Sequence, residues 1–207
     1  MTITLHHLEN SRSQRIIWLL EELGLPYEIK RYERDPKTSK APQSLKAIHP
    51  LGKSPMIEDD GDVIIETAVI VEYLVEKAGG KLGAPNDKNG ARLYTQYLHF
   101  AEASLMPPLY ASLVIGRLGL LGLPARSAVR RMVTEPLAWL ETELESRDYF
   151  AGDSLTAADI MMSFPLEAAG TRLGLGEFPN LKAYLDRIHS RPQYKTALEK
   201  GGPYAFA

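Results

Sequence analysis

The chain has 207 residues, which suits one large domain or two small ones, and its 44% hydrophobic and 24% charged residues are typical of a globular protein. Its net charge of -2 provides no basic excess for a nucleic acid or an anionic membrane surface, so we expect neither as a partner. Cysteine is absent, which excludes disulfides and cysteine nucleophiles from these residues, so any thiol chemistry must use the thiol of a ligand.

The first eighty residues alternate between strand patterns and helix patterns. Residues 2–8 alternate and include β-branched residues, which predicts a strand. From Arg12 onward, apolar residues recur at helical spacing until Gly24 and Pro26 end the pattern. The further predicted elements are a strand at 27–32, a short helix at 44–49, a hairpin of strands at 56–59 and 62–65, and a helix from Glu66 to Gly80. The predicted order is therefore βαβαββα.

The rest of the chain shows only helical patterns. Residues 81–88 are polar, contain Gly and Pro and lack periodicity, so they predict a linker between two domains. Helical spacing follows at 89–116, 125–146, 157–170, 179–189 and 192–200. Pro107, Pro108 and Pro136 are expected to kink or split the first two of these helices, because proline lacks the helical N–H donor.

The N-terminus lacks a basic start followed by an apolar run, and no later stretch has the apolar length of a membrane span. We therefore expect a cytoplasmic protein without a membrane partner.

Four segments make a family resemblance specific: SRSQRIIWLLEELGLPYE (11–28), HPLGKSPMIEDDGDVIIET (49–67), YFAGDSLTAADI (149–160) and FPNLKAYLDRIHSRPQY (178–194). In this order they resemble the soluble glutathione transferases, and most closely the bacterial and fungal members whose first helix starts with Ser-Arg. The resemblance implies a thioredoxin-like, glutathione-binding domain at 1–80 with a mixed four-stranded sheet. It also implies a linker at 81–88, an all-helical domain at 89–207 that forms the pocket for a hydrophobic electrophile, and a homodimer.

The segment 49–67 carries the expected glutathione site. Thr67 and its backbone N–H are implied to hold the γ-glutamyl carboxylate, because a helix N-terminus favours anions, while Glu66 pairs with the ammonium group. Ser54–Pro55 matches the cis-proline position of the family, where the main chain of Ser54 pairs with the cysteinyl backbone of glutathione. Lys53 resembles the basic residue that faces the glycine carboxylate. A capping threonine, a trans proline and a solvated lysine are the structural alternatives.

The glutathione thiol needs activation, because a free thiol has a pKa of about 8.5 and its thiolate is the nucleophile. A hydroxyl that donates to sulfur at a helix N-terminus lowers that pKa. Ser11 occupies the place of the activating serine, four residues before Arg15, and is also a candidate N-cap. Asn10 is the alternative activator, since its amide N–H can donate the same bond; Arg12 and Ser13 are further alternatives.

Other residues receive narrower assignments. Thr156 and Asp159 predict a capping box at the head of an apolar helix, with a role in folding rather than in chemistry. Met106 and Tyr110 suit an apolar pocket for the second substrate, although such residues at helical spacing are commonly core. The five histidines lack metal-ligand spacing, so no metal is expected.

The resemblance thus implies an enzyme that activates glutathione for attack on a hydrophobic electrophile. Two alternatives stay open at this point: a glutathione-dependent peroxidase or disulfide reductase, and a non-catalytic module of the same fold that associates with other proteins.

Overall fold

The computed structural model describes residues 2–206, and these residues form two compact units. The first unit comprises the chain up to Gly83 together with His189–Ala205, and the second comprises Ala84–Ile188 with Phe206. The break between Gly83 and Ala84 falls inside the predicted linker.

A mixed four-stranded sheet forms the centre of the first unit, with the strand order β2-β1-β3-β4. Strand β1 pairs parallel with β2 on one side and antiparallel with β3 on the other. The strands are β1 (Ile3–Leu8), β2 (Tyr27–Tyr32), β3 (Met56–Asp59) and β4 (Asp62–Ile64). The predicted mixed sheet is therefore confirmed, and so is the βαβαββα order.

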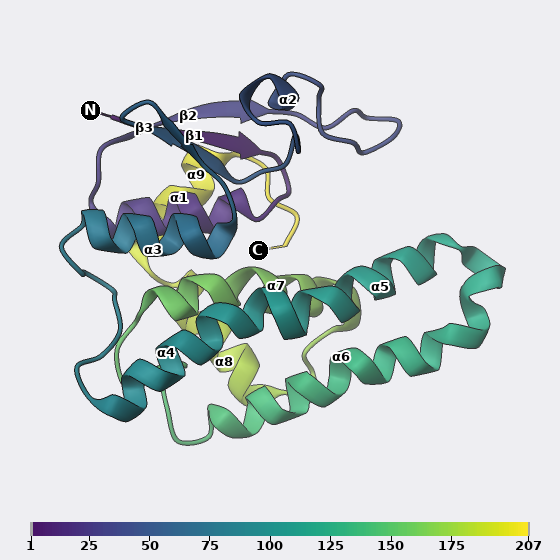
Figure 1. The fold of residues 1–207 in the computed structure, drawn as a ribbon. Coiled ribbons are helices and arrows are strands. Elements are labelled where there is room, and N and C mark those ends of the chain that lie inside the picture. Colours follow the sequence, from purple (N-terminus) through teal and green to yellow (C-terminus); the bar gives the residue numbers. More distant parts are fainter. Residues whose placement is uncertain (1, 207) are drawn as a thin grey trace. The chain divides into compact units, whose positions relative to one another are not determined.

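Helices cover both faces of this sheet. Figure 1 shows α1 (Ser13–Leu23) and α3 (Thr67–Lys77) on one face and the short α2 (Leu45–Ile48) on the other. Because successive side chains of a strand point to opposite faces, β1 presents one set of residues to α1 and the other to α2. Leu8 belongs to the second set and packs with Leu45 and Met56 in a small buried cluster.

The hairpin between β3 and β4 turns at Asp60 and Gly61, as the Asp-Asp-Gly sequence predicts. Both residues have positive φ, 51° and 92°, which is the signature of the tight turn whose twist matches paired strands. Asp59, just before the turn, is buried and accepts a hydrogen bond from the Tyr73 hydroxyl at 2.7 Å. This bond joins the end of β3 to the middle of α3.

The C-terminal helix α9 (Pro192–Gly201) packs against α1 within the first unit, which differs from the expected division that placed 89–207 in one helical domain. The Trp18 and Tyr194 rings meet edge to face at 5.3 Å, and Gln14 donates to the Ala197 carbonyl at 2.8 Å. The buried carboxylate of Glu22 accepts two hydrogen bonds from Arg191, at 2.6 and 2.9 Å. Nearly all of α1 is buried as a result. The sheet and α3 cover part of its surface, and α9 covers the rest.

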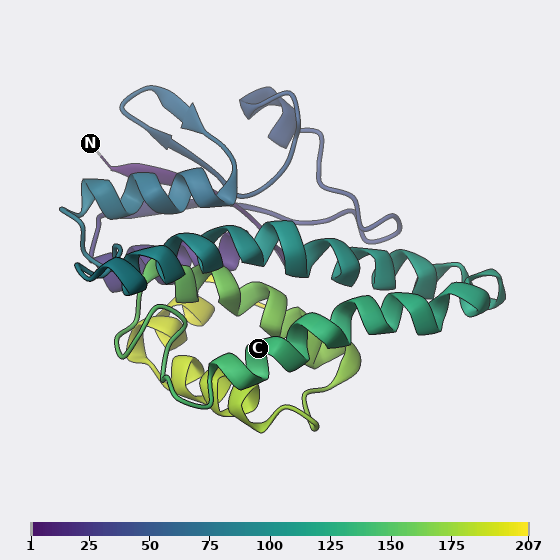
Figure 2. The same ribbon diagram turned by 60° about the horizontal axis from the view of Figure 1, so that its bottom comes forward.

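The second unit is helical, and the only strand-like pairing among its described residues is an isolated bridge between Tyr149 and Gly152. Figure 2 shows α5 and α6 running side by side as a long hairpin. Its elements are α4 (Lys88–Phe100), a π-helical turn (Ala101–Leu105), α5 (Met106–Arg117), a 3-10 turn (Gly119–Gly122), α6 (Leu123–Glu143), α7 (Ala157–Leu173) and α8 (Pro179–His189). Within residues 2–206, none of the helices combines the length and apolarity needed to cross a bilayer.

The prolines of these helices act differently from one another. The π-helical turn ends two residues before Pro107, and the missing N–H donors and the rings of Pro107 and Pro108 disrupt the α-helical pattern of the turn before them. Pro136 does not split its helix, because α6 continues from Leu123 to Glu143 with Pro136 inside it. Pro165 likewise lies inside α7. Packing of the flanking turns therefore outweighs one lost hydrogen bond at both positions.

A capping box begins α7, the most buried helix of the second unit. Asp159 is fully buried and its Oδ2 accepts the N–H of Thr156 at 2.8 Å and the Thr156 hydroxyl at 2.9 Å. Its Oδ1 accepts the N–H of Phe150 at 2.9 Å and the Tyr184 hydroxyl at 3.3 Å. Burial raises the pKa of Asp159 to about 6, against the opposing effect of these hydrogen bonds. Asp159 thus joins the helix to two other segments, as well as capping it.

Candidate functional site

A cavity of about 180 Å3 opens in the first unit where the segment before β3 meets the start of α3. All five residues predicted for the glutathione site line it. The lining residues are Arg12, His49, Leu51, Lys53, Ser54, Pro55, Met56, Ile65, Glu66 and Thr67. The structure therefore brings together side chains that are far apart in the sequence, since Arg12 and Thr67 are separated by 55 positions.

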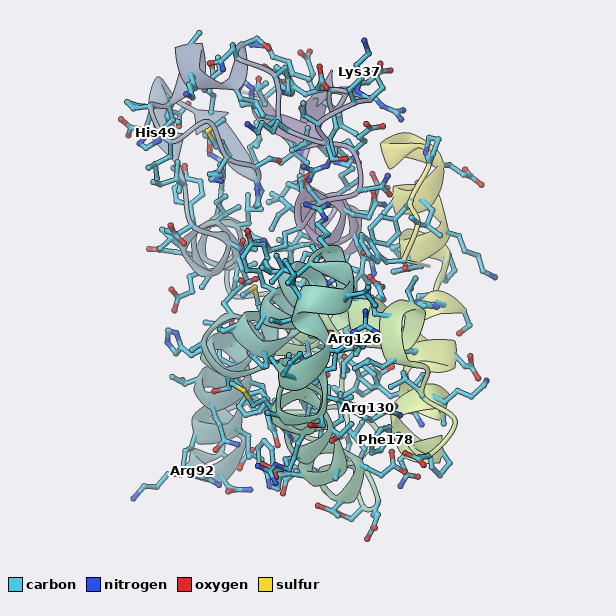
Figure 3. The ribbon with its side chains drawn as sticks, turned by 90° about the vertical axis from the view of Figure 1, so that its right-hand side faces the viewer. Lys37, His49, Arg92, Arg126, Arg130 and Phe178 are labelled. Carbon is cyan, nitrogen blue, oxygen red and sulfur yellow. The ribbon has the colours of Figure 1, made fainter. Side chains whose placement is uncertain are left out.

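Four lining residues were not predicted: His49, Leu51, Met56 and Ile65. All four lie inside or beside the 49–67 segment, but nothing in their local pattern distinguishes a wall residue from a core residue. The His49 ring, labelled in Figure 3, follows α2, and its Nδ1 accepts the N–H of Leu51 at 3.3 Å. That bond closes the loop that leads to Lys53.

Ser54 and Pro55 connect this loop to the sheet. The peptide bond between them is cis, as expected for this position. The Ser54 hydroxyl donates to the carbonyl of His6 at 2.8 Å and accepts the N–H of Leu8 at 3.3 Å. Because its hydroxyl proton is donated to β1, the Ser54 side chain has no proton left to donate to a ligand, whereas its main chain is available.

Glu66 and Thr67 form the start of α3. Glu66 is the N-cap residue and has a φ of 66°, a strained value for a residue with a side chain. Such strain is concentrated at ligand sites. The first intrahelical bond runs from the Ile70 N–H to the Glu66 carbonyl at 2.9 Å, so the preceding N–H groups of α3 have no intrahelical acceptor. The N-terminal end of α3 therefore offers an anion site beside an exposed carboxylate.

The charges around the cavity are mixed in sign. Arg12 and Lys53 provide two cations, the N-terminus of α3 adds a partial positive charge, and Glu66 provides one carboxylate. This pattern matches a small zwitterion that carries two carboxylates and one ammonium group.

The two expected thiol activators, Asn10 and Ser11, do not line the cavity. They are the two residues before Arg12, which lines it. Asn10 has a φ of 49°, and its Oδ1 accepts the N–H of Ala205 at 2.8 Å. Because a main-chain N–H can only donate, the amide oxygen must face Ala205, and the NH2 group points away from it.

Ser11 is buried, with 7% of its surface exposed, and its Oγ lies 2.7 Å from the Oγ of Ser13. It also accepts the N–H of Ser13 at 3.3 Å. The expected N-cap role of Ser11 is not observed, because α1 begins at Ser13 with Arg12 as the N-cap residue. The Ser11 hydroxyl instead belongs to a buried polar group beneath the helix start.

The chain is similar in sequence to a known protein family. A family model described as glutathione S-transferase, N-terminal domain, matches residues 1–76, and one described as glutathione S-transferase, C-terminal domain, matches residues 124–192. Glutathione S-transferase 3 of Schizosaccharomyces pombe is 40% identical, over 96% of this chain and 87% of its own. The chain belongs to the glutathione S-transferase family.

Two solved glutathione transferase structures extend the likeness to the whole fold. One, from Actinobacillus pleuropneumoniae, has a TM-score of 0.90 and 35% identity over 99% of this chain and 94% of its own. A family member from Pseudomonas fluorescens, with two glutathione molecules bound, has a TM-score of 0.81 and 25% identity over 96% and 92% of the two chains.

The residues expected to form the second pocket of this glutathione S-transferase lie on α5. Tyr110 is 63% exposed and Met106 is partly buried, so Tyr110 is not a core residue. Among the residues that the structure describes, no group of three or more His, Asp or Glu side chains is arranged to hold a metal ion.

Proposed function

We propose that this chain is a glutathione transferase whose first unit binds glutathione and activates its thiol for attack on a hydrophobic electrophile. The observation that carries the proposal is the charge pattern of the cavity, two cations and a helix N-terminus around a single carboxylate. Glutathione has two carboxylates and one ammonium group, and the solved relative with two bound glutathione molecules supports the same ligand.

The expected roles follow from this placement. Thr67 and the first N–H groups of α3 hold the γ-glutamyl carboxylate, and Glu66 accepts from the neighbouring ammonium group. Lys53 faces the glycine carboxylate, with Arg12 as a second cation beside it. Ser54 contributes its main chain, because its hydroxyl is bound to His6 and Leu8.

The first test separates a transferase from the other activities of the fold. Glutathione binding is measured by calorimetry, and rates are measured with glutathione against a chloronitrobenzene, an isothiocyanate, an epoxide, a hydroperoxide and a mixed disulfide. Turnover of the first three substrates supports the proposal. Turnover confined to the last two identifies a peroxidase or reductase, and absence of both binding and turnover identifies an association module.

We expect the second unit to supply the electrophile pocket, with Met106 and Tyr110 among its residues. Tyr110→Ala is then expected to raise KM for an aromatic electrophile while leaving KM for glutathione unchanged. The cytoplasmic location stays a prediction from the sequence.

Ser11 and Asn10 are tested as thiol activators by the pH at which the rate reaches its plateau. Loss of the activating hydrogen bond should move that plateau up by about one pH unit, because each unit corresponds to about 1.36 kcal/mol. We expect this shift for Ser11→Ala, with kcat falling more than KM rises. A shift in Asn10→Ala alone would instead assign the activation to the NH2 group of Asn10.

The homodimer expected from the family is tested by sedimentation. The species should have twice the chain mass of 23.0 kDa at micromolar concentration. Exposed apolar side chains occur in both units, among them Leu51, Val69 and Met132 at 57%, 50% and 53%, and they are the surface such a dimer would cover. A 23.0 kDa species at that concentration would contradict the expectation.

A further inference from the structure

A chain of buried polar groups leads from Ser11 to the last helix of the first unit, and it includes a histidine that the proposed function does not use. His7 lies on β1 with 1% of its surface exposed. Its Nε2 is 3.1 Å from the Gly201 carbonyl of α9, and its Nδ1 is 2.9 Å from the Ser13 hydroxyl. Ser13 Oγ in turn lies 2.7 Å from Ser11 Oγ.

The chemistry of these groups determines which atom donates at each link. A carbonyl oxygen can only accept, so His7 Nε2 must carry a proton and donate to Gly201. Burial and the nearby Arg31 lower the pKa of His7 to about 4, against the Gly201 bond and Glu9, so the ring is neutral at pH 7. A neutral ring with a proton on Nε2 has a bare Nδ1, which can only accept.

The Ser13 hydroxyl has one proton and three possible acceptors: Ser11 Oγ at 2.7 Å, His7 Nδ1 at 2.9 Å and the Leu8 carbonyl at 3.3 Å. Among the hydrogen bonds of residues 2–206, Ser13 is the one donor to the buried, bare Nδ1, so its proton is assigned to His7. Ser13 Oγ is then left to accept, and it accepts both from the Leu8 N–H at 3.2 Å and from the Ser11 hydroxyl. The bonds run in one direction, from Ser11 to Ser13 to His7 to Gly201.

The direction of the Ser11 hydrogen bond affects how well Ser11 can stabilise the glutathione thiolate. The proton of Ser11 is directed at Ser13, so the free side of Ser11 Oγ is an acceptor, whereas a thiolate needs a donor. To stabilise the thiolate, the Ser11 hydroxyl must turn away from Ser13. The chain lies next to the cavity wall, because the Leu8 N–H is shared between Ser13 Oγ and the Oγ of the cavity residue Ser54.

We propose that His7 is a positioning residue of the thiol site, which acts through Ser13 to hold the Ser11 hydroxyl proton away from the sulfur and so limits how strongly Ser11 stabilises the thiolate. This inference rests on the proposed glutathione site. Without the ring, Ser13 can donate to Ser11, and Ser11 can donate to sulfur without first losing a hydrogen bond.

The test is a pH titration of thiolate absorbance for glutathione bound to the full chain. His7→Leu is expected to lower the thiol pKa by about half a unit to one unit, since one neutral hydrogen bond no longer has to be broken. Ser11→Ala should raise it. His6→Leu is the matched control, because His6 is equally buried on the same strand but bonds to Tyr32 and Glu58 instead.

A double variant shows whether His7 acts through Ser11. If it does, Ser11→Ala with His7→Leu gives the thiol pKa of Ser11→Ala alone. An unchanged or raised thiol pKa in His7→Leu, or a His7 effect that persists without Ser11, overturns the proposal. If His7→Leu fails to fold, Ser13→Ala should lower the thiol pKa in the same way, because it also removes the acceptor of the Ser11 proton, and no decrease there overturns the proposal.

Nitrogen NMR of the unmodified protein, without any ligand, tests the direction of the hydrogen bonds from Ser11 to Gly201. The expected signal is a neutral His7 ring with its proton on Nε2 at pH 7, and a proton on Nδ1 would overturn the proposal. Failure of the unmodified protein to bind glutathione would overturn the proposed function and the role of His7 with it. Normal binding with no shift in Ser11→Ala would overturn the role of Ser11, and that of His7 acting through it, while leaving glutathione as the ligand.

Discussion

Asp159→Ala should lower the free energy of unfolding by about 3 to 5 kcal/mol, because it leaves several buried donors without an acceptor. Asp159 is fully buried and accepts from the N–H groups of Phe150 and Thr156 and from the Thr156 and Tyr184 hydroxyls. The capping role alone would account for only about 1 kcal/mol. Urea unfolding of the purified variant measures the loss.

Asp87→Ala is the matched control for this prediction. Asp87 is the N-cap residue of α4, and its side chain accepts a single bond, from the Gly90 N–H at 2.8 Å. Asp87→Ala should therefore lower the free energy of unfolding by about 1 kcal/mol. Equal losses in the two variants would show that Asp159 is only a cap, and a stable Asp159→Ala protein with greatly reduced turnover would place Asp159 in the chemistry.

The same carboxyl predicts a pH dependence. Its pKa in the folded chain is about 6, above the ordinary value of 3.8, so the folded state binds the proton more tightly than the unfolded state. The stabilisation from Asp159 is thus complete below the unfolded pKa and declines as the pH rises through about 6. The difference in unfolding free energy between the unmodified chain and Asp159→Ala should therefore be larger at pH 4 than at pH 7.

Glu66→Gln and Thr67→Ala should each raise the Kd for glutathione about 10- to 100-fold, because the first removes the negative charge that pairs with the ammonium group and the second removes a hydroxyl donor to the carboxylate. Thr67 is 5% exposed at the first position of α3, and Glu66 is its N-cap residue with a strained φ of 66°. Calorimetric titration of glutathione measures the change. The melting temperature should change little in Glu66→Gln, since that side chain makes no cap hydrogen bond.

Two variants control for charge and for folding. Glu72→Gln makes the same charge change at an exposed position of α3 and should leave Kd unaltered. Thr67→Ser keeps the hydroxyl and should retain most of the affinity. If Glu66→Gln and Thr67→Ala both bound glutathione normally, the cavity at the start of α3 would not be the glutathione site.

The sequence by itself determined the order of elements and the composition of the main site. Strand and helix periods near the N-terminus, the Asp-Asp-Gly turn and the segment 49–67 depend on local chemistry. Lys53, Ser54, Pro55, Glu66 and Thr67 could be named in advance because this segment resembles the glutathione transferases, and all of them line one cavity. All five needed the family resemblance for their roles, since a threonine at a helix start is otherwise an ordinary cap.

Only the tertiary structure decided the features that depend on contacts between distant segments. Helix α9 packs on α1, which is buried on nearly every side, and no local pattern indicates which element covers that helix. Asp159 gains Phe150 and Tyr184 as donors through packing, in addition to its local partner Thr156. The direction of the Ser11 hydrogen bond depends on His7 and on the Gly201 carbonyl, which is 194 positions away from that histidine along the chain. In a row of linked hydrogen bonds, the last group determines the direction, because it can only donate or only accept. The sequence does not show which group ends such a row.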